Sequence, residues 1–129
     1  MSAPTVIQEV RARKIFDSRG NPTIEVDILT HNGFGRAAAP AGASKGKWEV
    51  QSYPSGGVDQ AIKKVKEAVA PKLVGMNADR QETIDTVLHE IDATENFSKI
   101  GGNTAYAVSV ATSLAAASSK DIPLFQHLS

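Results

Sequence analysis

The sequence contains no cysteine and no excess of either charge. The missing cysteine excludes disulfides, thiolate nucleophiles and cysteine-ligated zinc, and it fits a reducing compartment. Fourteen basic residues offset fourteen acidic ones, and the pI is near 6.8. Because no surplus of positive charge is available to neutralise a polyanion, nucleic acid is not expected as a partner.

Long hydrophobic runs are also missing. No uninterrupted apolar segment approaches the roughly 20 residues that a bilayer span requires. Met1 is followed by Ser2-Ala3-Pro4 rather than by a basic region and an apolar signal core. We therefore expect a soluble, cytoplasmic chain with no membrane partner.

Two familiar kinds of chemical site can be excluded from residue spacing. The histidines His31, His89 and His127 have no ligand-spaced partner, so neither a histidine metal site nor a histidine-based triad is predicted. Residues 42–47 suggest a P-loop, but three residues rather than four separate its glycines. Trp48 also stands where that motif requires Ser or Thr.

The first third of the chain has the pattern of a β meander. Ile24, Val26 and Ile28 alternate with the residues between them, as a strand with two differently used faces requires. A turn is expected between Asp17 and Pro22, where Gly20 permits positive φ, and the Asn-Gly step before Phe34 favours a tight hairpin. We expect strands over residues 6–14, 22–29 and 34–39.

The remaining periodic segments are helical. Apolar residues at 58, 62, 65 and 69 predict a helix that Pro71 ends or kinks. A second helix is expected to open near Asp79, with Glu82 completing a capping box. The Ala-rich segment 104–119 predicts a central helix whose small residues admit a neighbouring backbone.

A short helix beginning at Pro123 is expected to close the chain. Strands followed by helices predict an α+β domain, a three-stranded antiparallel meander followed by a helical bundle. With 129 residues, one domain is expected.

Four blocks of this sequence resemble enolase and occur in enolase order. Residues 12–26, ARKIFDSRGNPTIEV, are similar to the start of that family, and residues 40–46, PAGASKG, look like its P-S-G-A-S-T-G loop. Residues 92–99 resemble its D-G-T-x-N-K-S segment, and residues 122–128 resemble its V-P-L-Y-x-H-I ending. The resemblance implies that residues 1–129 form the amino-terminal capping domain, and that the catalytic β/α barrel is absent from this chain.

The resemblance implies a role in a magnesium-dependent lyase, the enolase (phosphopyruvate hydratase) of glycolysis, which dehydrates 2-phosphoglycerate to phosphoenolpyruvate. In that family the barrel supplies the first Mg²⁺ site and the proton-abstracting lysine, so the isolated chain is expected to be inactive. The loop containing Gly42, Ala43, Ser44, Lys45 and Gly46 would form an active-site lid, with Ser44 binding the second Mg²⁺. From the loop alone, a serine bonded to its own backbone is the simpler interpretation.

The resemblance further implies a homodimer in which Arg19 and Glu25 face the partner subunit and pair with charges on its barrel. Without the resemblance, these residues are an exposed turn arginine and a strand-face carboxylate.

The sequence departs from the family pattern at Ala41, Lys45 and residues 50–54. The main hypothesis is an enolase cut at its domain boundary, and these departures leave two alternatives open. One is a stand-alone assembly or binding module that pairs with a separate barrel, and the other is an enolase paralogue that has lost its chemistry.

Overall fold

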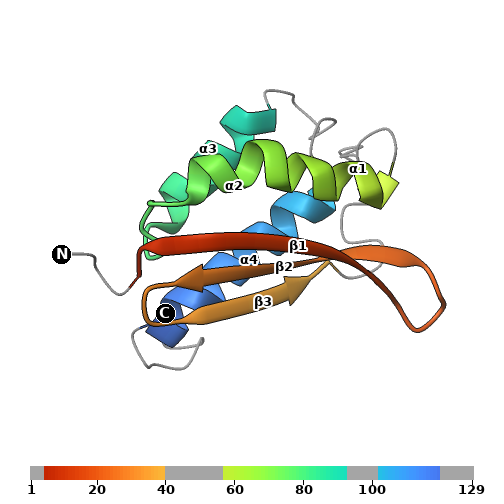
Figure 1. Ribbon diagram of the computed structural model, residues 1–129, viewed down its shortest axis with the longest axis horizontal. Helices are drawn as coiled ribbons and strands as arrows, with labels where there is room; N and C mark the ends of the chain where they lie inside the picture. Colours follow the sequence, from red (N-terminus) through yellow and green to blue (C-terminus); the bar gives the residue numbers. More distant parts are fainter. Residues whose placement is uncertain (1–4, 40–56, 93–101, 120–129) are drawn as a thin grey trace.

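The computed structural model describes residues 5–39, 57–92 and 102–119, which form a three-stranded antiparallel sheet with helices on one face (Figure 1). The strands are β1 (Ile7–Phe16), β2 (Pro22–Thr30) and β3 (Phe34–Ala38). The helical segments are α1 (Gly57–Lys64), the π-helix η1 (Val65–Val69), α2 (Ala70–Leu73), α3 (Gln81–Asp92) and α4 (Gly102–Ser119). The expected α+β class and the three-stranded meander are confirmed.

The sheet has the order β1-β2-β3, so each strand pairs with its neighbour in the sequence. Ile24, Val26 and Ile28 are completely buried on the face that the helices cover, as their alternation predicts. Gly20, in the β1–β2 turn, adopts a φ of +83°, the conformation for which glycine was expected there.

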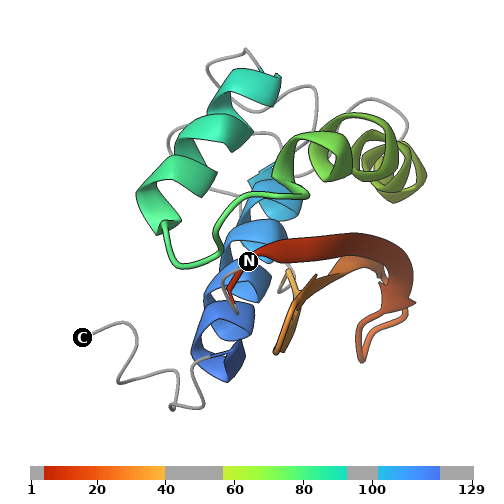
Figure 2. The same ribbon diagram turned by 60° about the vertical axis from the view of Figure 1, so that its left-hand side comes forward.

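Helix α4 is the centre of the domain. Figure 2 shows it between the sheet and α3, and its residues are buried on more than one side because both neighbours pack against it. The predicted central position is thus confirmed, although the helix begins at Gly102, two residues earlier than expected.

Two glycines let the backbone of α4 lie directly against the sheet. A Cβ atom added to Gly35 would fall within 2.5 Å of the Ala115 nitrogen and would overlap the Ala111 carbonyl oxygen. A Cβ on Gly33 would lie 2.5 Å from the Ser119 nitrogen. Gly33 follows Asn32 in the expected hairpin, but its φ is not positive, so close packing rather than turn conformation requires glycine there.

The helix that was expected to end or kink at Pro71 continues to Leu73 as α2. Immediately before the proline, η1 shifts the hydrogen bonding from α to π, and the Ala70 N–H donates to the Val65 carbonyl. Proline in a helix lacks a donor and crowds the carbonyl four residues earlier, and a wider π turn relieves that crowding. The local change in register lets the helix pass the proline.

Element boundaries differ from the sequence predictions by one or two residues elsewhere. Helix α3 begins at Gln81 rather than near Asp79, and β1 extends to Phe16. The predicted helix at Pro123 lies outside the described residues. Within 5–39, 57–92 and 102–119, no helix combines the length and the apolar character needed to cross a membrane.

Candidate functional site

The predicted lid residues, Gly42 to Gly46 with the candidate metal ligand Ser44, lie outside the described residues. Their role therefore stays a prediction. The two predicted interface residues, Arg19 and Glu25, are described, and both belong to the β1–β2 hairpin.

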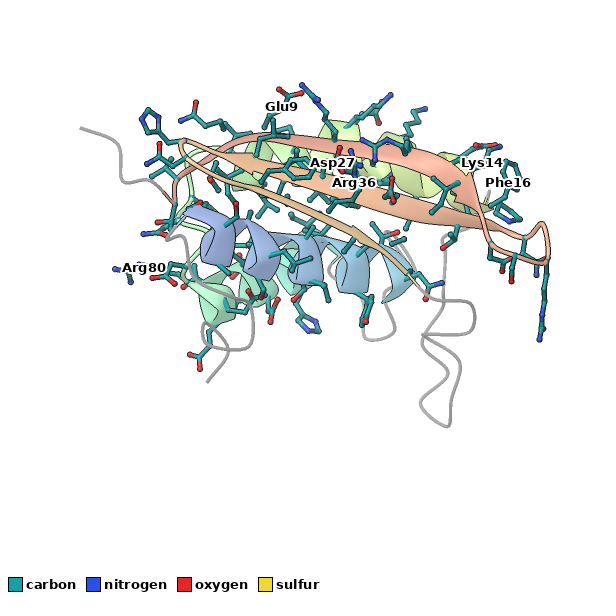
Figure 3. The ribbon with its side chains drawn as sticks, turned by 90° about the horizontal axis from the view of Figure 1, so that it is seen from below. Glu9, Lys14, Phe16, Asp27, Arg36 and Arg80 are labelled. Atoms are coloured by element: carbon teal, nitrogen blue, oxygen red, sulfur yellow. The ribbon has the colours of Figure 1, made fainter. Side chains whose placement is uncertain are left out.

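Glu25 lies on the outer face of the sheet, which none of the described helices covers. Figure 3 shows Asp27 and Arg36 together on this face, on the side of the sheet opposite α4. The register explains their proximity, because Asp27 is paired with Arg11 of β1 and with Arg36 of β3, and Glu25 is paired with Arg13. Directly paired residues share one face of a sheet and bring their side chains together.

Four of these residues form an ion cluster: Arg13, Glu25, Asp27 and Arg36. Arg13 Nη1 lies 2.6 Å from Glu25 Oε1 and 3.2 Å from Asp27 Oδ1, and its Nη2 donates to Asp27 Oδ2. From the opposite strand, Arg36 Nε donates to Asp27 Oδ1 at 2.8 Å and its Nη2 donates to Oδ2 at 3.3 Å. Asp27 is therefore held between two forked guanidinium groups, which is a geometry specific to arginine.

The Asp27 carboxylate is ionised although its side chain is only 2% exposed. Burial by itself would raise the pKa of Asp27, but hydrogen bonds from Arg36 and Arg13, together with their positive charges, outweigh burial and lower it to about 2. The same hydrogen bonds raise the pKa of both arginines. Asp27 and both arginines are thus charged at neutral pH.

Solvent reaches the arginines of the cluster more easily than the carboxylates. The Arg36 side chain is 53% exposed and that of Arg13 is 37% exposed, whereas Glu25 is 21% exposed. The Arg36 guanidinium also lies 5.2 Å from the centre of the Phe34 ring, which is itself exposed. The outer face of the sheet therefore exposes the guanidinium groups of Arg13 and Arg36 and the ring of Phe34. The two arginines of the cluster are matched by its two carboxylates.

Arg19 lies in the turn at the end of the hairpin, beyond the Phe16–Pro22 pair, whereas Glu25 is paired with Arg13 farther along the strands. The turn is shaped by Asp17, whose Oδ1 accepts hydrogen bonds from the backbone N–H groups of Arg19 and Asn21 at 2.9 and 2.8 Å. These backbone bonds lower the pKa of Asp17. The structure thus places Arg19 on an ordered turn, apart from the ion cluster.

Sequence reasoning missed Arg13, Asp27 and Arg36. The signal was present, because Arg11 and Arg13 alternate on one predicted strand and Glu25 and Asp27 alternate on the next. A register counted outward from the turn at residues 17–21 would have paired Arg13 with Glu25. Arg36 could not be assigned in the same way without the length of the second hairpin connection.

The described residues offer no alternative metal site. No group of three or more His, Asp or Glu side chains in ranges 5–39, 57–92 and 102–119 could hold a metal ion. The magnesium prediction therefore depends on Ser44 and on the resemblance.

Comparison with known proteins decides the family. The model of the family described as "Enolase, N-terminal domain" matches residues 7–128. The chain belongs to the enolase N-terminal domain family. Its meander and helices agree with that fold, so the recognition made from the four sequence blocks is confirmed.

Similar full-length proteins carry the name enolase. The chain is 60% identical to the enolase of Methanosphaera stadtmanae and 58% identical to that of Methanothermobacter thermautotrophicus, over 96% of its length in both comparisons. It is 47% identical to the enolase of Pyrococcus furiosus over 99% of its length. The chain spans only about 30% of the length of these relatives.

Proposed function

We propose that this enolase N-terminal domain acts as part of an enolase that dehydrates 2-phosphoglycerate to phosphoenolpyruvate in the cytoplasm. The observation that carries the proposal is the family match over residues 7–128, supported by relatives that are 58–60% identical and named enolase. Because the chain spans about 30% of those relatives, it would supply a supporting domain, and the remaining part of the enzyme would supply the reacting groups.

In this proposal residues 42–46 close over the substrate, and Ser44 provides an oxygen ligand to Mg²⁺. A serine hydroxyl is a hard oxygen donor of the type that Mg²⁺ prefers, and flanking Gly42 and Gly46 would allow close approach of the backbone. Magnesium would supply electrostatic stabilisation of the charge that develops on the substrate. The contribution of this chain would be to bind, to orient and to exclude water.

We also propose that the outer face of the sheet takes part in homodimer formation. Glu25 lies on that uncovered face, and the arginine and aromatic groups beside it belong to the residue types enriched at interfaces. Glu25 would contribute through the cluster that it forms with Arg13 and Arg36, whereas Arg19 would reach the partner from the hairpin turn.

A chimeric enzyme tests the proposed function. Residues 1–129 would replace the aligned amino-terminal part of the Methanosphaera stadtmanae enolase, to which 124 residues align. We expect magnesium-dependent formation of phosphoenolpyruvate by the chimera and none by the truncated relative that lacks the replaced part. A folded chimera with no activity would contradict the proposal and would favour a domain that has lost the chemistry.

The dimer proposal is tested in the same chimera by sedimentation. Glu25→Gln and Arg19→Ala are each expected to weaken the dimer, and Glu90→Gln is the matched control because it removes an exposed carboxylate on α3, away from the outer face of the sheet. If all three variants dimerise as tightly as the unmodified chimera, Glu25 and Arg19 have no role in the interface.

A further inference from the structure

Helices α3 and α4 enclose a surface groove of about 230 Å³ that the proposed lyase function does not use. It lies between residues 85–89 of α3 and residues 105–109 of α4. Its walls are formed by Asp85, Leu88 and His89 of α3 and by Ala105, Tyr106 and Ser109 of α4.

A directed chain of hydrogen bonds ends at the carboxylate in this groove. The Ser113 hydroxyl donates to Gln81 Oε1 at 2.6 Å, and Gln81 Nε2 donates to Ser109 Oγ at 2.8 Å. The Ser109 hydroxyl in turn donates to Asp85 Oδ1 at 2.9 Å, and Gln81 Nε2 also lies 3.2 Å from that oxygen. Every donor in the chain points toward Asp85, and such chains strengthen one another.

These contacts orient the carboxylate and leave one oxygen unused. All hydrogen bonds of Asp85 in the described part of the chain end on Oδ1, and no arginine or lysine there forms an ion pair with it. Four other carboxylates in the described residues form ion pairs, among them Asp27 with Arg13 and Asp59 with Lys14 at 3.2 Å. Among the described residues, the groove therefore presents an oriented carboxylate that pairs with no arginine or lysine.

The size and the wall of the groove limit what could fill it. Sites for cofactors and drug-sized ligands usually measure about 300–1,000 Å³, so this smaller and open groove suits a single side chain. Tyr106 of α4 is 45% exposed, and Leu88 of α3 is buried. An exposed aromatic ring beside a carboxylate favours a cation that can also lie flat on the ring.

The geometry points to a binding site for the guanidinium group of an arginine side chain on a partner protein. The guanidinium would donate to Asp85 Oδ2 while stacking on Tyr106, a combination that its planar fork allows and a lysine ammonium does not. Ser109 and Gln81 position the carboxylate and do not touch the arginine. This inference is independent of the proposed lyase function.

Nuclear magnetic resonance titration of the 129-residue chain with acetyl-arginine amide tests the site. We expect saturable shifts of the Ala105, Tyr106 and Ser109 amides with a dissociation constant on the order of 1 mM, which is typical of one isolated contact group. Acetyl-citrulline amide, which has the same shape without the charge, should bind about fivefold more weakly or worse. Equal shifts with both probes, or shifts located elsewhere, would overturn the inference.

Three variants test whether binding of acetyl-arginine amide depends on the groove itself or on the charge of the helix in general. Asp85→Asn keeps an acceptor for Ser109 and removes the charge, and Tyr106→Leu removes the ring from an exposed position outside the hydrogen-bond chain. Each should weaken acetyl-arginine amide binding about fivefold, whereas Glu90→Gln, a charge removal on the same helix outside the groove, should leave it unchanged. Tyr106→Leu alone decides the outcome if Asp85→Asn does not fold, and unchanged binding by that variant rejects the site.

Discussion

At the scale of single residues, Asp27 has the clearest energetic role. It is a nearly inaccessible carboxylate on a face that no described helix covers, and two arginines provide its cover and its counter-charges. Removing one member of a buried ion cluster leaves the others without compensation. We expect Asp27→Asn to lower the free energy of unfolding by about 2–4 kcal/mol in urea titrations at neutral pH. Asp59→Asn should change it little, because the Asp59 side chain is 76% exposed and its ion pair with Lys14 is solvated.

The pH dependence of stability follows from the same residue. Because the pKa of Asp27 is lowered to about 2 in the folded state, its contribution is complete above the unfolded value of 3.8 and is lost as the pH falls through about 2. The shift corresponds to about 2 kcal/mol. Urea titrations between pH 5 and about 2 should therefore show the difference between the native chain and Asp27→Asn shrinking as acid is added. A constant difference would show that the Asp27 charge contributes nothing.

A further prediction at the scale of single residues concerns Ser44 and its proposed role in catalysis. In the chimeric enzyme, Ser44→Ala should lower turnover and raise the magnesium concentration needed for activity, because the variant removes one proposed oxygen ligand. Ser52→Ala, a hydroxyl removal a few residues later in the sequence, provides the control. Equal magnesium dependence of the two variants in steady-state assays would remove Ser44 from the proposed metal site.

At the scale of elements, the close contact between β3 and α4 limits which residues can replace Gly35. Gly35→Ala places a methyl group against the α4 backbone, which cannot move aside like a side chain. We expect a loss of about 3 kcal/mol or more of unfolding free energy in urea titrations. Gly20→Ala has open space around its Cβ and a strained φ, so it should lose only about 1–2 kcal/mol. The prediction is wrong if the Gly20 variant is the less stable of the two.

The elements were largely predictable because their periodicities are local. Ile24, Val26 and Ile28 show their strand without reference to the rest of the chain, and the small residues of α4 indicate close central packing. The π-helical η1 was not predictable, because it depends on how the helix accommodates Pro71 while Val65 and Val69 both stay buried. The glycine at 33 was assigned to turn geometry because Ser119, which it contacts, lies far away in sequence.

The candidate site was less predictable than the fold. Arg13, Asp27 and Arg36 come together only through the register of three strands, and sequence patterns leave register open. Residues 42–46 were assigned by resemblance, so the physics of the chain alone did not identify them.

At the scale of the whole molecule, the isolated 129-residue chain should be inactive. In the proposed enzyme the reacting groups belong to the part of the protein that this chain does not span. Purified chain incubated with 2-phosphoglycerate and Mg²⁺ should therefore give no phosphoenolpyruvate above background in a coupled assay. Sustained magnesium-dependent turnover by the isolated chain would contradict the proposed division of roles.

The packing of α4 against the sheet also bears on how the domain is made. The Thr30 and Ser119 hydroxyls that join β2 to α4 are 89 residues apart in the chain, so the helix that covers the inner face of β2 and β3 is synthesised long after both strands. At translation rates of about 5–20 residues per second, β2 waits roughly 4–18 seconds for the end of this helix. During that interval Ile24, Val26 and Ile28 lack the cover that α4 provides, and a nascent chain that stalls before Gly102 presents ribosome-associated chaperones with an apolar sheet surface.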